Sequence, residues 1–175
     1  LASPSGPVLL GVGRLSAEKD FATAILALTE LPEAVRLLIL GEGPERPALE
    51  ALAASLKLED RVSLPGRVDN PFAYLSRAQL CLVPSRAEGL PGVLIEALAC
   101  ATPVVASDCP GASARLLGWG QYGQLFEVGN SGQLARAVIR SLQAPCPAPP
   151  AQHLAPYSCD QACAAYQDLL LGTGS

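Results

Sequence analysis

The chain has 175 residues, half of them apolar, and carries a formal net charge of −4 at pH 7. This length suits one domain with a sizeable core. The small negative charge and the lack of a run rich in Lys or Arg argue against nucleic acid as the main partner. The sequence contains no stretch of about 18 apolar residues, so it predicts no transmembrane helix.

Apolar runs alternate with amphipathic stretches along most of the chain. We expect strands over 8–12, 35–40, 61–64, 79–83, 103–106 and 123–128, and helices over 21–31, 47–57, 70–77, 92–100 and 133–143. Alternating strands and helices, with strands that are apolar throughout, are typical of a parallel sheet covered on both faces. The fold class predicted is therefore α/β, a Rossmann-like parallel sheet with helices on both faces.

The two ends of the chain have a different composition. Residues 1–7 lack a basic segment followed by an apolar core, so they are interpreted as a linker, and the missing initiator Met suggests a piece of a longer protein. Residues 144–150 have polyproline character. The sequence predicts a Rossmann-like domain over 1–143, a Pro-rich linker over 144–158, and a C-terminal helix and tail over 159–175.

The cysteines and the single histidine are interpreted as structural. Cys81 and Cys100 lie in apolar runs, and the chain has no C-x-x-C pair, although Cys159 and Cys163 are four apart. We expect free thiols in a reducing compartment rather than disulfides or a zinc site. His153 stands in the Pro-rich stretch, where we expect a solvated loop residue.

Glycine-containing turns follow four of the predicted strands. Since ligands of such sheets bind beyond the carboxyl ends of the strands, we expect these turns to gather at one edge. Ser16 stands where a dinucleotide fingerprint has its third glycine, which disfavours that motif. The turns are Gly11-Val12-Gly13, Gly41-Glu42-Gly43, Gly66-Arg67-Val68 and Glu88-Gly89.

Two cations, Arg14 and Lys19, lie five apart just after the first predicted strand. A guanidinium fork and an ammonium point charge together suit a diphosphate. Taken alone, the pair is better explained as two solvated surface cations.

Glu88 and Glu96 flank a predicted strand-to-helix turn and lie eight apart. A helix N-terminus offers unpaired amides and a partial positive charge to an anion, and Gly89 and Gly92 let the backbone approach a ligand closely. A nucleotide-sugar would place its anion at that terminus and hydroxyls at each carboxylate. The alternatives are two surface carboxylates, or the acid pair of a glycoside hydrolase, whose facing geometry this spacing does not impose.

Two further loops contain polar or aromatic residues. Residues 108–113 follow a predicted strand, and a plain turn explains them at least as well as a ligand contact does. Trp119 and Tyr122 flank glycines, and we expect them to pack locally rather than to stack on a sugar.

Taken in order, five segments resemble the C-terminal, donor-binding domain of retaining glycosyltransferases of the GT-B fold, the glycosyltransferase family 4 or glycosyl transferases group 1. The order of these segments over nearly the whole chain is specific to this family, and the segment that contains Glu88 and Glu96 is the most informative of the five. The segments are Gly13-Arg14-Leu15 with Glu18-Lys19, Leu38 to Pro44, Val62 to Val68, Pro84 to Ala106, and Tyr157-Ser158 with the closing helix to Tyr166.

The resemblance implies a role for each candidate residue. Arg14 and Lys19 would hold the donor diphosphate and stabilise the leaving group, and Glu88 would bind sugar hydroxyls near the reacting carbon, so these three form the catalytic set. Glu96 would accept hydrogen bonds from the ribose, and Val68 would meet the base. Donor binding would also involve Gly13, Gly89, Leu90 and Pro91.

The resemblance also implies a function for the longer protein. It would transfer a hexosyl group from a nucleoside-diphosphate sugar, expected to be a UDP-sugar, to a glycan or lipid-linked acceptor. The configuration at the anomeric carbon would be retained, and no metal ion would be needed. An N-terminal acceptor domain would lie outside this chain, so we expect the piece alone to transfer little or nothing. The expected location is cytoplasmic, peripheral at the inner membrane face.

Two other functions stay open at this point. One is a catalytically inactive GT-B module that binds nucleotide or a partner, and the other is a GT-B sugar-nucleotide epimerase, which needs a His near the sugar. The chain departs from the family pattern at two single positions and one stretch: Asp20 and Ala101 stand where Gly is usual, and Ala114-Arg115 where a Glu is common.

Overall fold

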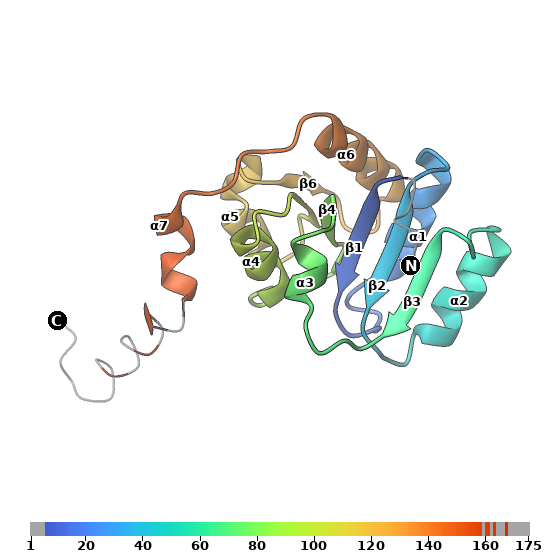
Figure 1. The fold of residues 1–175 in the computed structure, drawn as a ribbon, viewed down its shortest axis with the longest axis horizontal. Coiled ribbons are helices and arrows are strands. Elements are labelled where there is room, and N and C mark those ends of the chain that lie inside the picture. Colours follow the sequence, from blue (N-terminus) through green and yellow to red (C-terminus); the bar gives the residue numbers. More distant parts are fainter. Residues whose placement is uncertain (1–5, 159, 162, 164–166, 168–175) are drawn as a thin grey trace.

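The computed structural model describes residues 6–158 together with 160, 161, 163 and 167 (Figure 1). A six-stranded sheet runs in the order β3-β2-β1-β4-β5-β6, and every neighbouring pair is parallel. The chain builds outward from β1 to β3, then returns to the other side of β1, which creates a topological switch point between β1 and β4. The strands are β1 (Val8–Val12), β2 (Arg36–Leu40), β3 (Val62–Gly66), β4 (Leu80–Val83), β5 (Val104–Ser107) and β6 (Gln124–Phe126).

Helices cover both faces of this sheet (Figure 1). One face carries α1 (Phe21–Ala27), α2 (Arg46–Ser55) and α6 (Ser131–Gln143); the other carries α3 (Phe72–Leu75), α4 (Gly92–Ala99) and α5 (Ser113–Leu116). The predicted α/β fold, a Rossmann-like parallel sheet with helices on both faces, is therefore confirmed.

The strands are apolar on both sides because each side faces helices. In β1, Leu9 and Leu10 point to opposite faces, belong to different core clusters, and are 1% and 0% exposed. Burial of one such side chain contributes about 1.5–3 kcal/mol. This double burial is the physical reason why the uninterrupted apolar runs predicted a parallel sheet.

Several short elements were not expected from the sequence. The first predicted helix ends early as a 3₁₀ turn, η1 (Leu28–Glu30), and α5 and η2 (Gly118–Gly120) occupy a stretch without a predicted helix. Such elements have too few residues to show a helical period. Trp119, expected to pack locally, is 78% exposed, so that expectation is wrong.

Residues 151–157, predicted to be linker, form α7 (Ala151–Leu154) and η3 (Ala155–Tyr157). Leu154 and Tyr157 pack against the core cluster beneath α4 and α5. His153 is part-buried, and its Nε2 lies 2.8 Å from the Leu116 carbonyl oxygen. Its ring packs edge-on against the ring of Tyr122, with the two ring centroids 4.7 Å apart. The expectation of a solvated His153 is therefore wrong, because this segment is anchored to the domain.

Parts of the predicted ends lie outside the described residues, namely 1–5, Cys159 and most of the expected final helix, 160–171. Among the described cysteines, Cys81, Cys100, Cys109, Cys146 and Cys163 are free thiols. Within the described ranges, no helix combines the length and apolarity needed to cross a bilayer.

Candidate functional site

The loops that follow the strands are joined at the carboxyl edge of the sheet, where the glycine turns were expected to gather. The amide of Gly13 donates to the Leu40 carbonyl at 3.0 Å, and the amide of Gly41 donates to the Gly66 carbonyl at 2.9 Å. On the other side of the switch point, the Glu88 amide donates to Pro110 at 3.1 Å. The edge is therefore a continuous surface of bonded loops.

Two glycines allow these loops to approach each other. Gly41 has φ +147°, and a Cβ there would lie 1.8 Å from the Gly13 carbonyl oxygen. Gly111 has φ +131°, and a Cβ there would lie 1.5 Å from the Glu88 carbonyl oxygen. Any larger residue at either position would separate neighbouring loops.

The loops after β1, β2 and β3 line an open cavity of about 450 Å³. Three predicted site residues line it, namely Gly13, Arg14 and Val68. The cavity thus brings a predicted diphosphate cation together with the residue expected to meet the base. The full lining is Val12, Gly13, Arg14, Leu40, Gly41, Glu42, Arg67, Val68, Asp69 and Pro71.

Glu42 is held at this cavity by Arg46, a pair that the sequence interpretation missed. Arg46 Nη2 lies 2.7 Å from Glu42 Oε1, and Nε donates to Oε2 at 2.9 Å. The hydrogen bonds from Arg46 lower the pKa of Glu42, and the bonds that Arg46 donates to Glu42 and Glu50 raise its own pKa. The spacing of four residues on either side of Arg46 was the available signal.

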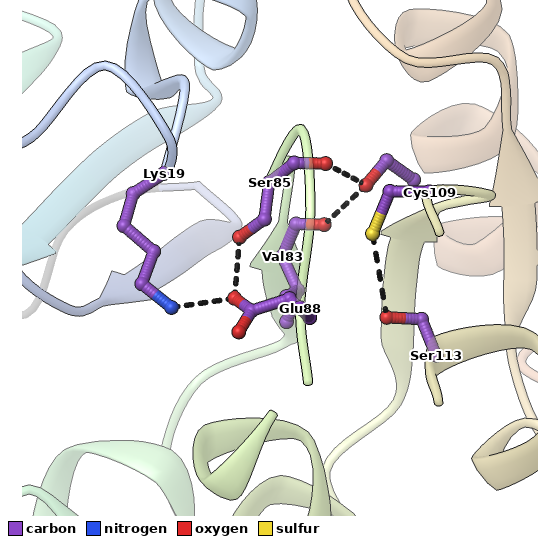
Figure 2. Close-up of polar contacts among 7 residues, drawn as sticks. Lys19, Val83, Ser85, Glu88, Cys109 and Ser113 are labelled. Atoms are coloured by element: carbon purple, nitrogen blue, oxygen red, sulfur yellow. Dashed lines mark hydrogen bonds and ion pairs between the residues drawn. The ribbon is translucent and has the colours of Figure 1, made fainter. Parts of the chain in front are cut away.

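Lys19 and Glu88 meet across the switch point (Figure 2). Lys19 Nζ lies 2.5 Å from Glu88 Oε1, and Ser85 Oγ donates to the same oxygen at 2.6 Å. Glu88 is only 9% exposed, and a buried carboxylate is stable only when paired and hydrogen-bonded. The structure therefore brings together two residues predicted from separate motifs, and adds Ser85, which had no predicted role.

A second pair ties the same two loops together. The Arg86 amide donates to the Glu18 carbonyl at 2.7 Å, and Arg86 Nη2 lies 3.2 Å from Asp20 Oδ2. Asp20 also accepts a bond from Thr23 Oγ1 at 2.9 Å. These contacts hold the segment on both sides of Lys19 against the loop after β4.

Glu96 lies in α4, where it makes no ion pair or hydrogen bond through its side chain with another described residue. Its Oε1 lies 3.9 Å from the position of a Cβ on Gly92, so the carboxylate is directed toward the first turn of the helix. Pro91 is the N-cap residue and provides no side-chain cap. The acidic side chain and the uncapped amides of α4 therefore lie at the same end of the helix.

The remaining predicted residues form the loop between Glu88 and α4. Pro91 is buried, Leu90 is 54% exposed, and a Cβ on Gly89 would meet no atom within 4 Å. None of them lines the cavity beside Val68. Lys19 connects the two parts, because its Cδ lies 3.8 Å from the position of a Cβ on Gly13.

A metal site is not evident in the described part of the chain, where no three His, Cys, Asp or Glu side chains are grouped to hold an ion. His153 contacts Leu116 and Tyr122, neither of which lines the cavity. Besides the predicted Arg14, Lys19, Glu88 and Glu96, the carboxyl edge carries the charged side chains of Glu42, Arg67 and Asp69 at the cavity and of Asp20 and Arg86 between the loops.

Comparison with known proteins matches residues 6–144 to the family model described as Glycosyl transferases group 1. The chain is 36% identical over 135 residues to N-acetylgalactosamine-N,N'-diacetylbacillosaminyl-diphospho-undecaprenol 4-alpha-N-acetylgalactosaminyltransferase of Campylobacter jejuni, covering 77% of this chain and 37% of the relative. It also resembles the structure of Anabaena Alr3699/HepE in complex with UDP, with TM-score 0.75 and 28% identity over 79% of this chain and 39% of that one. The chain thus spans less than two fifths of each of these relatives.

Proposed function

The chain belongs to the glycosyl transferases group 1 family, and on that premise we propose that it is the donor-binding domain of a retaining glycosyltransferase. Its fold is one half of the GT-B fold, in agreement with the sequence prediction. The donor proposed is a nucleoside-diphosphate sugar, with UDP as the nucleotide. The longer protein would transfer the sugar to a glycan or lipid-linked acceptor bound mainly by another domain.

One observation carries this proposal. Lys19 and Glu88 form an ion pair across the switch point, beside the cavity that contains Arg14 and Val68. In open parallel sheets this crevice is where ligands bind. Lys19 lies between the Glu88 carboxylate and the cavity, which matches the order sugar, diphosphate and nucleoside in a nucleotide-sugar.

The proposed chemistry is electrostatic. Arg14 and Lys19 neutralise the diphosphate as charge develops on the leaving group, and the first-turn amides of α4 add partial positive charge. Glu88 accepts hydrogen bonds from sugar hydroxyls, and Glu96 accepts them from the ribose. These groups supply the stabilisation without a metal ion.

The epimerase alternative is disfavoured by the position of His153. That side chain is engaged with Leu116 and Tyr122 rather than with the cavity or with Glu88. The inactive binding module shares the same nucleotide site, so it is distinguished by transfer assays on the longer protein.

Calorimetric titration with UDP, GDP, ADP and NAD tests the proposal. We expect saturable binding of UDP and at least tenfold weaker binding in Arg14→Ala and Glu96→Ala, because each removes a charge-assisted hydrogen bond. Arg77→Ala, which removes another cation from outside the site, is the matched control. Failure of every nucleotide to bind, or equal losses in the control, would contradict the proposal.

A further inference from the structure

Both partners of the Glu88 carboxylate approach the same oxygen atom. Lys19 Nζ and Ser85 Oγ lie 2.5 and 2.6 Å from Oε1 (Figure 2). No donor in the described residues is bonded to Oε2. The carboxylate is therefore anchored through one oxygen, and the other oxygen retains its capacity to accept a bond.

The two anchors differ in how readily they can move. The Lys19 side chain is 29% exposed and lies beside Gly13 at the cavity, so its flexible stem can carry the ammonium to a diphosphate. If it does, Glu88 loses its ion pair while its own side chain is only 8% exposed. A buried carboxylate that loses its cation needs another donor to keep its position.

Ser85 is placed to be that donor. It is 1% exposed, and its carbonyl oxygen accepts a bond from Ser107, which is fully buried at the end of β5 and also bonds to Val83 (Figure 2). These contacts hold the backbone of Ser85 independently of Lys19. Its hydroxyl can therefore keep Oε1 in place whether or not Lys19 is engaged elsewhere.

We propose that Ser85 is a positioning residue that holds Glu88 when Lys19 turns from this carboxylate to the donor diphosphate, so that Glu88 Oε2 meets a sugar hydroxyl. The inference rests on the proposed function and adds an exchange of partners within the site. Ser85 itself contacts neither phosphate nor sugar in this account. Its loss therefore affects recognition of the sugar more than recognition of the nucleotide.

The test compares the chain with Ser85→Ala and with Ser113→Ala. Ser113 is also a fully buried serine at this edge, but within the described residues its hydroxyl has a single polar contact, with Cys109 Sγ at 3.8 Å (Figure 2). Each protein is titrated with UDP and with the UDP conjugates of glucose, galactose, N-acetylglucosamine and N-acetylgalactosamine, and its melting temperature is measured. GDP and GDP-mannose replace these probes if the nucleotide panel selects guanine.

We expect the unaltered chain to bind one UDP-sugar more tightly than UDP. Ser85→Ala should keep the affinity for UDP within about twofold and lose about fivefold or more for that UDP-sugar, since a hydrogen bond to a charged group is removed. Ser113→Ala should keep the ratio of the two affinities. Both variants are expected to melt as folded proteins.

Three results would overturn the inference. The first is a Ser85→Ala variant that retains the full preference for the UDP-sugar, and the second is an equal weakening of UDP and UDP-sugar binding in both variants. The third is an unaltered chain that binds every UDP-sugar no more tightly than UDP. By contrast, an unaltered chain that binds no nucleotide at all would contradict the proposed function itself.

Discussion

The two halves of the sheet end in loops of opposite character. After β1, β2 and β3, the loops provide Arg14, Lys19 and a cavity of about 450 Å³. After β4, the loop and α4 provide Glu88, Glu96 and a set of uncapped backbone amides. The halves meet at the switch point through Lys19–Glu88 and through Asp20–Arg86.

This difference indicates a division of labour. The first half offers a cavity and the cations Arg14 and Lys19, which suit a base and phosphates, whereas the second offers the carboxylates Glu88 and Glu96, which suit hydroxyls. Each ion pair joins one residue of the loop after β1 to one residue of the loop after β4, so the two pairs fix the position of these loops relative to each other. A ligand that replaces Glu88 as the partner of Lys19 would change the contact between the halves without changing either sheet half.

The largest effect is expected from Glu96, which assigns the ribose to the second half. The unaltered chain should bind UDP about tenfold more tightly than 2′-deoxy-UDP, and Glu96→Gln should bind the two ligands nearly equally, because the carboxylate is a stronger acceptor than an amide. Competition calorimetry measures both affinities. A variant that keeps the preference for UDP would remove Glu96 from the ribose site and break the division.

The thiol of Cys81 tests how tightly the second half is packed. Cys81 lies in β4, and burial raises its pKa from 9.0 to about 12. Since the folded pKa is raised, the thiol's stabilising contribution is full below pH 9 and is lost as pH rises toward 12. Denaturation series should show the free energy of unfolding falling by about 1.4 kcal/mol more per pH unit above pH 9 than in Cys81→Ala. Equal slopes would mean that β4 is more open than the structure shows.

The smallest expected effect is on the free energy of unfolding, and it compares one residue with left-handed backbone from each half of the sheet. Ala101 has φ +56° and ends α4, with its amide bonded to Leu98 and that of Thr102 bonded to Ala97. Ala101→Gly should raise the free energy of unfolding by about 0.5–1 kcal/mol, because glycine adopts this backbone without strain. Urea denaturation measures the difference, and a loss of stability would contradict this explanation.

Asp20 provides the contrasting case, with φ +48°. Asp20→Gly also relieves a left-handed residue, but it removes the bond from Thr23 and the ion pair with Arg86. The free energy of unfolding should therefore fall by about 1 kcal/mol rather than rise. A gain equal to that of Ala101→Gly would show that the Asp20–Arg86 pair does not hold the halves together.

These two positions also show what the sequence does and does not reveal. Their departure from the family glycines was visible in the sequence, but only the structure shows that both have left-handed backbone. The strands were predictable because double burial makes Leu9, Leu10 and their equivalents apolar without interruption. Short elements such as α5 and α7 were not, because four residues do not establish a helical period.

The site was predictable in part for a similar reason. Arg14, Lys19, Glu88 and Glu96 belong to motifs with fixed spacing, so the sequence alone proposes them as candidates. Ser85 and Arg86 lie within the same block, but their importance depends on contacts with Glu88 and Asp20, and those contacts exist only after β1 and β4 are adjacent. The burial of His153 likewise depends on where the proline-rich segment returns to the domain.

The most direct test of the account is UDP titration of Lys19→Met and Glu88→Gln side by side. We expect opposite signs: Lys19→Met should bind UDP about tenfold more weakly, whereas Glu88→Gln should bind it at least as tightly as the unaltered chain, because Lys19 no longer has to leave a charged partner. A comparable loss of UDP affinity in both variants would contradict the exchange of partners at the switch point.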